Sequence, residues 1–278
     1  MTLQHTKAEL FLKFHQNRAT LLLPNAWDCA SARLFEEAGF SAIGTTSAGI
    51  AFAQGYVDGQ HIQRDEMIQV IARIAATVQV PVTADIEAGY GPTTNDVAET
   101  IREVIGAGAV GVNLEDNTGI FKPLYSLPQQ VERIEAAREE AQRIGLALVI
   151  NARIDTYLFS IGEETARLED TIRRGRAYLQ AGANSIFVPG VADPSLISTL
   201  VREIPGPLNI MVGPGMLSAP ELFNLGVTRL SIGGAAMLAT MGLVRDIARE
   251  LHKQGTYERM ALHPYAFTDA WKLFQKKG

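Results

Sequence analysis

Acidic residues follow two consecutive apolar, strand-like segments of the sequence. Asp85 ends one segment and Glu87 stands two positions later, so both side chains point to the same side of an extended chain. Glu115 ends the next apolar segment, and Asp58 lies in the loop before the first one. Two carboxylates about 5 Å apart repel by about 3 kcal/mol at an effective dielectric constant of about 20, so converging acids need a cation or shared protons. Because no histidine is near these positions, the oxygen ligands favour Mg²⁺ or Mn²⁺ over zinc.

An arginine and a short hydroxyl-containing segment could hold an anionic substrate beside such an ion. Arg153 follows the strand-like run 147–151, and a guanidinium holds a carboxylate through two charge-assisted hydrogen bonds worth about 1.5–3 kcal/mol each. Thr46, Ser47 and Ala48 stand where a helix or turn begins, and hydroxyl and backbone N–H groups bind anions there. Together these groups suit a small 2-oxo acid whose enolate oxygen a divalent ion stabilises. They predict cleavage of a bond next to that enolate.

The same residues also have structural interpretations. Asp85 could cap the turn after its strand, and Arg153 could form an internal ion pair with Asp155. Asn209, in another strand-like run, could contact the far end of the substrate or pack inside the protein. The presence of acids and an arginine at successive strand ends favours the functional interpretation.

Short apolar runs alternate with amphipathic segments along most of the chain. Eight runs lack the apolar–polar alternation of half-exposed strands, as buried parallel strands do: 20–23, 42–45, 82–85, 110–115, 147–151, 185–188, 208–212 and 228–232. Helical segments are expected at 29–38, 64–77, 95–107, 128–144 and 164–181, with Asn95 and Ser218 as N-caps. This alternation predicts an α/β fold, a (β/α)8 TIM barrel, with an open doubly wound sheet as the alternative. In such a barrel the acids above lie at the catalytic face.

The C-terminal part of the chain is expected to extend the barrel rather than to form a second domain. Residues 1–278 are therefore predicted to be one domain, and 241–278 a helical extension of it that carries several aromatic side chains. These aromatic residues could pack on a partner subunit or on the chain's own barrel.

The composition of the chain limits the classes of partner that we expect it to bind. The chain of 278 residues has 25 Lys and Arg against 30 Asp and Glu, and its pI is about 5.6, so nothing in its overall charge favours nucleic acid or anionic membranes. Its hydrophobic content of 47% excludes a disordered chain. One cysteine excludes internal disulfides and a cysteine-rich zinc site. We expect a cytoplasmic protein with no nucleic-acid or membrane partner.

Several of these segments resemble the phosphoenolpyruvate mutase/isocitrate lyase superfamily, over residues 21–234. Residues 46–49 (TSAG) with 55–58 (GYVD) resemble the family's substrate-carboxylate loop and the acid that follows it. Residues 82–91 (VTADIEAGYG) resemble the metal motif, and residues 113–116 (NLED) resemble the segment with the next acid. Residues 151–155 (NARID) resemble the segment with the substrate-binding arginine.

The resemblance implies roles for individual residues. It implies that Asp85 binds Mg²⁺ directly or through water, with further acids around it: Glu87, Glu115 and Asp58. It implies that the pyruvate-like part of the substrate meets Thr46, Ser47, Ala48 and Arg153. Catalytic roles are expected for Asp58, Glu115 and Arg153, and substrate contacts also for Asp85 and Asn209. The family further implies a barrel whose last helix is swapped between subunits, in a homotetramer that is a dimer of dimers.

The gate loop departs from that of the isocitrate-cleaving lyases. Those enzymes carry a lysine–x–cysteine–glycine–histidine loop, whereas residues 117–124 (NTGIFKPL) contain neither cysteine nor histidine. The phosphonate-cleaving branch uses a lysine and an asparagine here; Asn117 and Lys122 are the candidates, although Lys122 is not cleanly in register.

The gate loop therefore favours simple C–C bond cleavage. We predict a Mg²⁺-dependent lyase acting on a small 2-oxo or 2-hydroxy dicarboxylate, with oxaloacetate decarboxylation as the simplest reaction. The alternatives are P–C bond chemistry on phosphonopyruvate, as a mutase or hydrolase, and non-catalytic binding of a 2-oxo acid.

Overall fold

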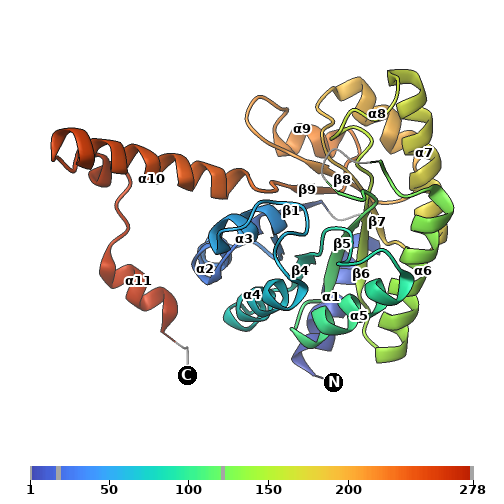
Figure 1. Cartoon of the computed structure of the whole chain (residues 1–278), viewed down its shortest axis with the longest axis horizontal. Helices are drawn as coiled ribbons and strands as arrows, with labels where there is room; N and C mark the ends of the chain where they lie inside the picture. Colours follow the sequence, from blue (N-terminus) through green and yellow to red (C-terminus); the bar gives the residue numbers. More distant parts are fainter. Residues whose placement is uncertain (1, 17–19, 120–122, 276–278) are drawn as a thin grey trace.

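A closed parallel sheet forms the centre of the protein (Figure 1). The computed structural model describes residues 2–16, 20–119 and 123–275. Its strands are β1 (Leu21–Leu23), β2 (Asn25–Ala26), β3 (Ile43–Thr45), β4 (Val82–Asp85), β5 (Gly111–Glu115), β6 (Val149–Arg153), β7 (Ser185–Val188), β8 (Leu208–Met211) and β9 (Arg229–Ser231). All neighbouring pairs are parallel, in the order β1-β9-β8-β7-β6-β5-β4-β3-β2.

A short strand that was not predicted, β2, follows the first predicted strand after Pro24 and closes the barrel. Before the proline, Leu21 of β1 pairs with Arg229 of β9; after it, Asn25 of β2 pairs with Gly44 of β3. Pro24 has no N–H to donate, but its carbonyl accepts a hydrogen bond of 2.8 Å from the Gly44 N–H. One stretch of chain therefore joins both edges of the sheet. The eight predicted runs correspond to β1 and to β3 through β9, whereas β2 lies outside them. The closed barrel is confirmed over the open sheet.

Most of the helices cover the outside of this barrel (Figure 1). They are α1 (Leu3–Gln16), α2 (Cys29–Glu37), α3 (Ser47–Gln54), α4 (Arg64–Thr77), α5 (Thr94–Gly106), α6 (Leu127–Ile144), α7 (Glu164–Gln180), α8 (Pro194–Glu203), α9 (Ala219–Asn224), α10 (Ala235–Gln254) and α11 (Phe267–Phe274), with a 3₁₀ turn, η1, at Glu258–Ala261. The five predicted helical segments agree with α2, α4, α5, α6 and α7 to within one residue at each end. None of the described helices is long and apolar enough to cross a lipid bilayer.

One of the two predicted N-caps is wrong. Thr93, not Asn95, caps α5, because Asp96 stands three residues after it and completes a capping box: the Thr93 N–H donates to the Asp96 carboxylate at 2.9 Å. Ser218 caps α9 as predicted, and its N–H donates to Glu221 at 2.8 Å.

Helix α1 closes the N-terminal end of the barrel. Phe11 is fully buried there, and a Cβ added to Gly111, the first residue of β5, would lie 2.8 Å from the Phe11 ring. His15 packs on Phe11 and donates to its carbonyl at 2.9 Å, while burial lowers the pKa of His15 to about 3. His15 is thus a neutral packing residue, and the opposite end of the barrel is the one that remains for a site.

The C-terminal extension begins earlier than predicted. Helix α10 starts at Ala235 rather than at residue 241 and runs away from the barrel (Figure 1). The chain then returns, and α11 packs on α2 of the same chain, where the Arg33 guanidinium donates to the Leu273 carbonyl at 2.7 and 3.0 Å. Apolar side chains stay exposed on α10, among them Leu238 and Val244. A swap of this extension between subunits stays a prediction.

Close packing at Gly44 gives a test of the barrel closure. An added Cβ would lie 2.7 Å from Leu23 and 2.8 Å from Asn25, so we expect Gly44→Ala to lower the free energy of unfolding by about 1–3 kcal/mol. Gly106→Ala is the matched control: no heavy atom lies within 4 Å of its Cβ position, and alanine suits a helix at least as well. Urea unfolding compares the two variants. Equal stability of both would contradict the described closure.

Candidate active site

A cavity of about 260 Å³ lies at the C-terminal ends of the barrel strands. It gathers residues from the β3, β4, β5 and β6 ends: Ser47, Asp58, Gly59, Glu87, Glu115, Asn117, Arg153, Leu158 and Phe159. Six of these are residues that the sequence marked as candidates for binding, catalysis or gating. The barrel therefore brings together side chains that are up to about a hundred positions apart in the chain.

Asp85 is hydrogen-bonded to Ser47, a residue that lines this cavity, and has one oxygen without a partner among the described residues. Its Oδ2 accepts hydrogen bonds from the Ser47 N–H at 3.1 Å and from the Ser47 hydroxyl at 2.8 Å, and its own N–H donates to the Thr45 hydroxyl. Its Oδ1 is buried and has no hydrogen-bond partner among the described residues. Asp85 thus binds the start of α3 instead of capping its own turn. A buried, unsatisfied carboxylate oxygen is costly and suits a cation or an ordered water.

Glu87 is held by two residues that share its unusual backbone conformation. Glu87, Gln60 and Tyr90 have φ angles of 49°, 61° and 56°, a left-handed region that costs non-glycine residues about 1–3 kcal/mol. The Gln60 N–H donates to Glu87 at 2.5 Å, the Tyr90 hydroxyl donates to it at 3.3 Å, and the Tyr90 N–H donates to the Gln60 side chain. Such strain is typical of functional sites.

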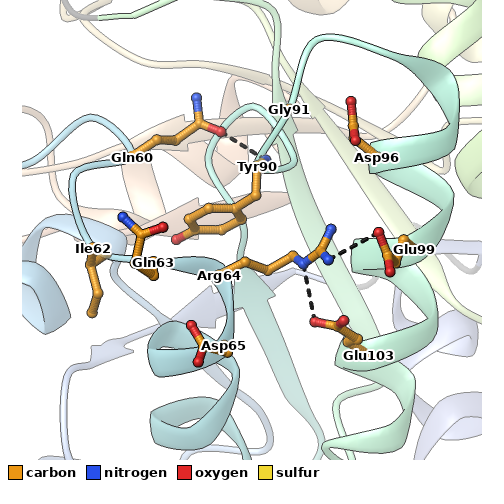
Figure 2. Close-up of a pocket in the computed structure, with 10 residues that line it drawn as sticks. All are labelled: Gln60, Ile62, Gln63, Arg64, Asp65, Tyr90, Gly91, Asp96, Glu99 and Glu103. Carbon is orange, nitrogen blue, oxygen red and sulfur yellow. Dashed lines mark hydrogen bonds and ion pairs between the residues drawn. The ribbon is translucent and has the colours of Figure 1, made fainter.

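A larger groove of about 630 Å³ begins beside Gln60 and Tyr90 (Figure 2). It contains Arg64, whose guanidinium pairs with Glu99 at 3.0 Å and with Glu103 at 3.2 Å. In the described part of the chain, the groove shares no lining residue with the 260 Å³ cavity. We assign the candidate site to the smaller cavity, because the Arg153 side chain lines it and because Ser47, another lining residue, binds Asp85, whose second oxygen has no partner among the residues that the structure describes.

Burial, together with repulsion from neighbouring acids, raises the pKa of several carboxyl groups in the site. Burial, followed by the charges of Asp58 and Asp85, raises the pKa of Glu87 to about 8. Burial and the Asp85 charge also raise the pKa of Asp58, and burial raises the pKa of Glu115 well above its usual range despite the nearby arginine. Without a cation, part of this cluster is therefore protonated at neutral pH.

Arg153 forms the internal ion pair with Asp155 that the sequence suggested, and a second one with Glu115. Its Nη1 lies 2.7 Å from Glu115 and its Nε lies 2.6 Å from Asp155. Although burial opposes the charge, the acids Asp155, Glu115 and Asp85 raise the pKa of Arg153, so it stays a cation. Because its side chain also lines the cavity, a substrate carboxylate could displace one of these partners.

Asp155 was not among the predicted site residues, yet it links two of them. One of its oxygens accepts from Arg153, and the other accepts from the Asn117 amide at 2.6 Å. The two-residue spacing from Arg153 is the sequence signal that could have identified it. Asn117 also pairs with Leu124 in an antiparallel bridge that spans the gate loop. Lys122 lies outside the described residues.

The anion-binding segment and Asn209 lie differently from what we expected. The Thr46 hydroxyl caps α3 by accepting from the Gly49 N–H, and the Ser47 N–H already donates to Asp85. Anion binding by this segment would then depend on the backbone N–H of Ala48. Asn209 is fully buried inside the barrel, where its amide donates to Ser231 at 3.2 Å. It does not line the cavity.

The three predicted metal ligands do not form a ready-made cluster. Among the described residues, no group of three or more His, Cys, Asp or Glu side chains is placed to hold a metal ion. Glu115 pairs with Arg153, and Glu87 accepts from its own neighbours. Asp85 is the acid of the three with an unsatisfied oxygen, which fits an ion bound by one carboxylate and by waters that the other acids hold.

A buried arginine on α6 supports the loop that carries Glu87. Arg133 donates to the carbonyls of Ala88 and Gly91, and its guanidinium lies 4.2 Å from the centre of the Tyr125 ring. The neighbouring Gln130 donates to the Glu115 carbonyl at 3.2 Å. Nothing in the helical pattern distinguishes Arg133 from the half-buried Arg138 and the exposed Arg143 of the same helix, so the sequence did not identify it.

Comparison with known proteins identifies the family. The model of the phosphoenolpyruvate phosphomutase family matches residues 11–252. The chain belongs to the phosphoenolpyruvate mutase/isocitrate lyase superfamily. The predicted resemblance is therefore confirmed.

Relatives within this superfamily differ in activity. A crystal structure from Burkholderia cenocepacia described as a lyase/mutase is 38% identical, with a TM-score of 0.91 over 99% of this chain and 98% of that one. An uncharacterized Mycobacterium tuberculosis protein is 34% identical over 86% of this chain and 87% of its own. Phosphonopyruvate hydrolase of Variovorax is 28% identical (81% and 79% covered), and oxaloacetate decarboxylase of Pseudomonas entomophila is 29% identical (81% and 78%).

The raised pKa of Glu87 predicts a pH dependence of stability in EDTA. A pKa of about 8 in the folded state, against 4.5 ordinarily, means that the folded chain keeps a proton which the unfolded chain has lost. The free energy of unfolding then falls as the pH rises from about 5 to about 8, by a few kcal/mol at most. Glu87→Gln should remove this part of the pH dependence. Urea unfolding of both proteins at several pH values measures it, and parallel pH profiles would refute the assignment.

Proposed function

We propose that this protein is a Mg²⁺-dependent lyase that breaks a C–C bond in a small 2-oxo or 2-hydroxy dicarboxylate, with oxaloacetate decarboxylation as the simplest reaction. One observation carries the proposal: Asp85, one oxygen of which has no partner in the described part of the chain, is hydrogen-bonded to Ser47, which lines the same cavity as the largely buried guanidinium of Arg153. The unsatisfied oxygen suits a cation and the guanidinium suits a substrate carboxylate. A 2-oxo acid offers both partners within one small molecule.

The donor set fits a hard divalent ion, Mg²⁺ or Mn²⁺. Asp85 would hold it directly or through water, and a positive charge there would favour the ionised forms of Glu87, Asp58 and Glu115, whose pKa values are raised. These are oxygen donors, as Mg²⁺ prefers. A phosphonopyruvate hydrolase of this superfamily has been crystallised with oxalate and Mg²⁺. When bound, the ion would act as a Lewis acid towards the 2-oxo group.

The chain's own residues supply binding and proton exchange. Arg153 would exchange one of its ion pairs for the substrate carboxylate, and the Ser47 hydroxyl and Ala48 backbone would orient the same end. Asp58 lines the cavity with a raised pKa, which suits it to return the proton that the product carbon needs. Leu158 and Phe159 would limit access of water. Loss of CO₂ requires no acid or base from the gate loop, which agrees with the absence of cysteine and histidine from residues 117–124.

P–C bond chemistry on phosphonopyruvate is the second candidate, supported by the similarity to a phosphonopyruvate hydrolase. A phosphonate needs cationic partners. Among the described residues that line the cavity, Arg153 is the single cation, and two carboxylates already pair with it. This reaction would depend on Lys122, so Lys122→Ala should abolish it and leave oxaloacetate decarboxylation intact.

The proposed function is tested by pyruvate release with Mg²⁺ and in EDTA. The panel is oxaloacetate, phosphonopyruvate, isocitrate, methylisocitrate and 4-hydroxy-2-oxo acids. We expect EDTA-sensitive turnover of oxaloacetate or a related dicarboxylate, well above spontaneous breakdown. Turnover of phosphonopyruvate alone would favour the second candidate, and tight binding of a 2-oxo acid without turnover would indicate a binding protein.

Asp85 and Arg153 should affect different kinetic constants. Asp85→Asn keeps the shape but removes the charge, so we expect turnover to fall by about 10²–10³ and Mg²⁺ affinity to fall with it. Arg153→Lys loses the paired donors and should raise KM about a hundredfold. The exposed Asp65→Asn in the neighbouring groove is the control for both. Steady-state kinetics that leave either variant equal to Asp65→Asn would contradict its assigned role.

We also propose that the chain forms a dimer of dimers through its C-terminal extension. The side chain of Val244 is 58% exposed on α10, among other apolar side chains. Light scattering should give about four times the chain mass of 30.2 kDa, and Val244→Asp should lower that mass. Arg245→Gln, an exposed neighbour on the same helix, should not. A monomeric wild type, or an unchanged Val244→Asp assembly, would refute this interface.

A further inference from the structure

Asp116 follows Glu115 in the chain but faces away from the candidate cavity. It is fully buried, and its Oδ1 accepts a hydrogen bond of 3.0 Å from the Asp155 N–H. Its Oδ2 accepts from the Tyr178 hydroxyl at 2.8 Å and from the Arg174 guanidinium at 3.1 Å. Both donors belong to α7 on the outside of the barrel. Asp116 is thus a buried carboxylate whose partners connect α7 to the residue that holds Arg153.

Asp155 links Asp116 to two residues that line the cavity, Arg153 and Asn117. Its backbone is held by Asp116, while its side-chain oxygens accept from Arg153 at 2.6 Å and from Asn117 at 2.6 Å. Each link is a hydrogen bond between buried or nearly buried groups, where competition from water is weak. The orientation of Arg153 and Asn117 therefore depends on the position of the Asp155 backbone.

Arg174 also meets the far end of the gate-loop segment. Its guanidinium donates to the Tyr125 carbonyl at 3.0 Å, and the Tyr125 N–H donates to the Asp116 carbonyl at 2.8 Å. Asn117 stands before that segment and Tyr125 stands after it, so both flanks connect to the same buried group. Helix α7 is itself fixed, because Gly175 lets Ile204 approach to where a Cβ would lie 2.9 Å away.

We propose that Arg174 and Tyr178 are positioning residues that act through Asp116 and Asp155 to orient Arg153 for the substrate carboxylate. The inference rests on the proposed function only for the role of Arg153. Without the Arg174 guanidinium, Asp116 loses a charged partner in a buried place. It then shifts towards other donors, and the Asp155 N–H loses its fixed acceptor.

Variants of Arg174 and Tyr178 distinguish a positioning role of these residues from a packing role. Arg174→Met keeps the aliphatic stem and removes the charge and donors, and Tyr178→Phe removes one hydroxyl and keeps the ring. Arg174→Lys restores a charge and should give intermediate values. Arg173→Met is the matched control, because the Arg173 side chain is 67% exposed and pairs with Asp170, as Arg174 also does.

Hydrogen–deuterium exchange tests the chain of contacts without any ligand. Peptides that contain Asp155 or Tyr125 should exchange about tenfold faster in Arg174→Met and a few-fold faster in Tyr178→Phe. The same peptides in Arg173→Met, and peptides from β8 and β9 in all variants, should match the wild type. Unchanged exchange at Asp155, or an equal increase across the whole chain, would overturn the proposal.

Oxalate, a small mimic of a 2-oxo carboxylate, tests the consequence for binding. With Mg²⁺ present, calorimetry should show an oxalate Kd about tenfold weaker in Arg174→Met than in Arg173→Met, and KM should rise more than kcat falls. An unchanged Kd despite faster exchange at Asp155 would overturn the positioning role. Because exchange is measured without substrate, a failure of the proposed lyase activity would be distinguishable from a failure of this inference.

Discussion

Repulsion among carboxylates at the ends of β4 and β5 is the constraint on which the rest of the site depends. Asp85, Glu87 and Glu115 lie within one small region with Asp58 beside them, and each is at least partly removed from water. The protein balances these charges in three ways. Arg153 neutralises one acid, protons remain on others, and one Asp85 oxygen is left without a partner. The divalent cation that we propose would replace the protons and satisfy that oxygen.

Keeping these acids together requires a rigid surround. The positive φ angles of Glu87, Gln60 and Tyr90 hold one carboxylate in a conformation that an unrestrained chain avoids. The buried Arg133 holds the loop that follows, through two of its carbonyls. On the other side, Arg174 lies behind the acid that orients Arg153. Buried guanidinium groups outside the cavity thus fix the charged groups inside it, since a long side chain with several donors can tie separate loops together.

Features with a local cause could be predicted from the sequence, and those that arise from long-range packing could not. Short apolar runs gave the strand positions, and the barrel rule then placed Asp85, Glu115 and Arg153 at one end. The short strand β2 after Pro24 escaped prediction because it is defined by its pairing with β3, while β1 before the proline pairs with β9. The partners of Glu87 and Asp116 escaped as well, since a glutamine in a loop or an arginine on a helix looks the same whether or not it is buried. For Asn209 the sequence left a substrate contact and a packing role open, and its amide donates to Ser231 inside the barrel.

Calorimetric titration of oxalate with and without Mg²⁺ tests the assignment of the site most directly. If Asp85 holds a cation that shares the ligand with Arg153, oxalate should bind with Mg²⁺ present and fail to bind in EDTA, and Asp85→Asn should abolish the difference. Oxalate that binds equally well in EDTA, or that binds wild type and Asp85→Asn alike with Mg²⁺, would contradict a metal-dependent 2-oxo acid site in this barrel.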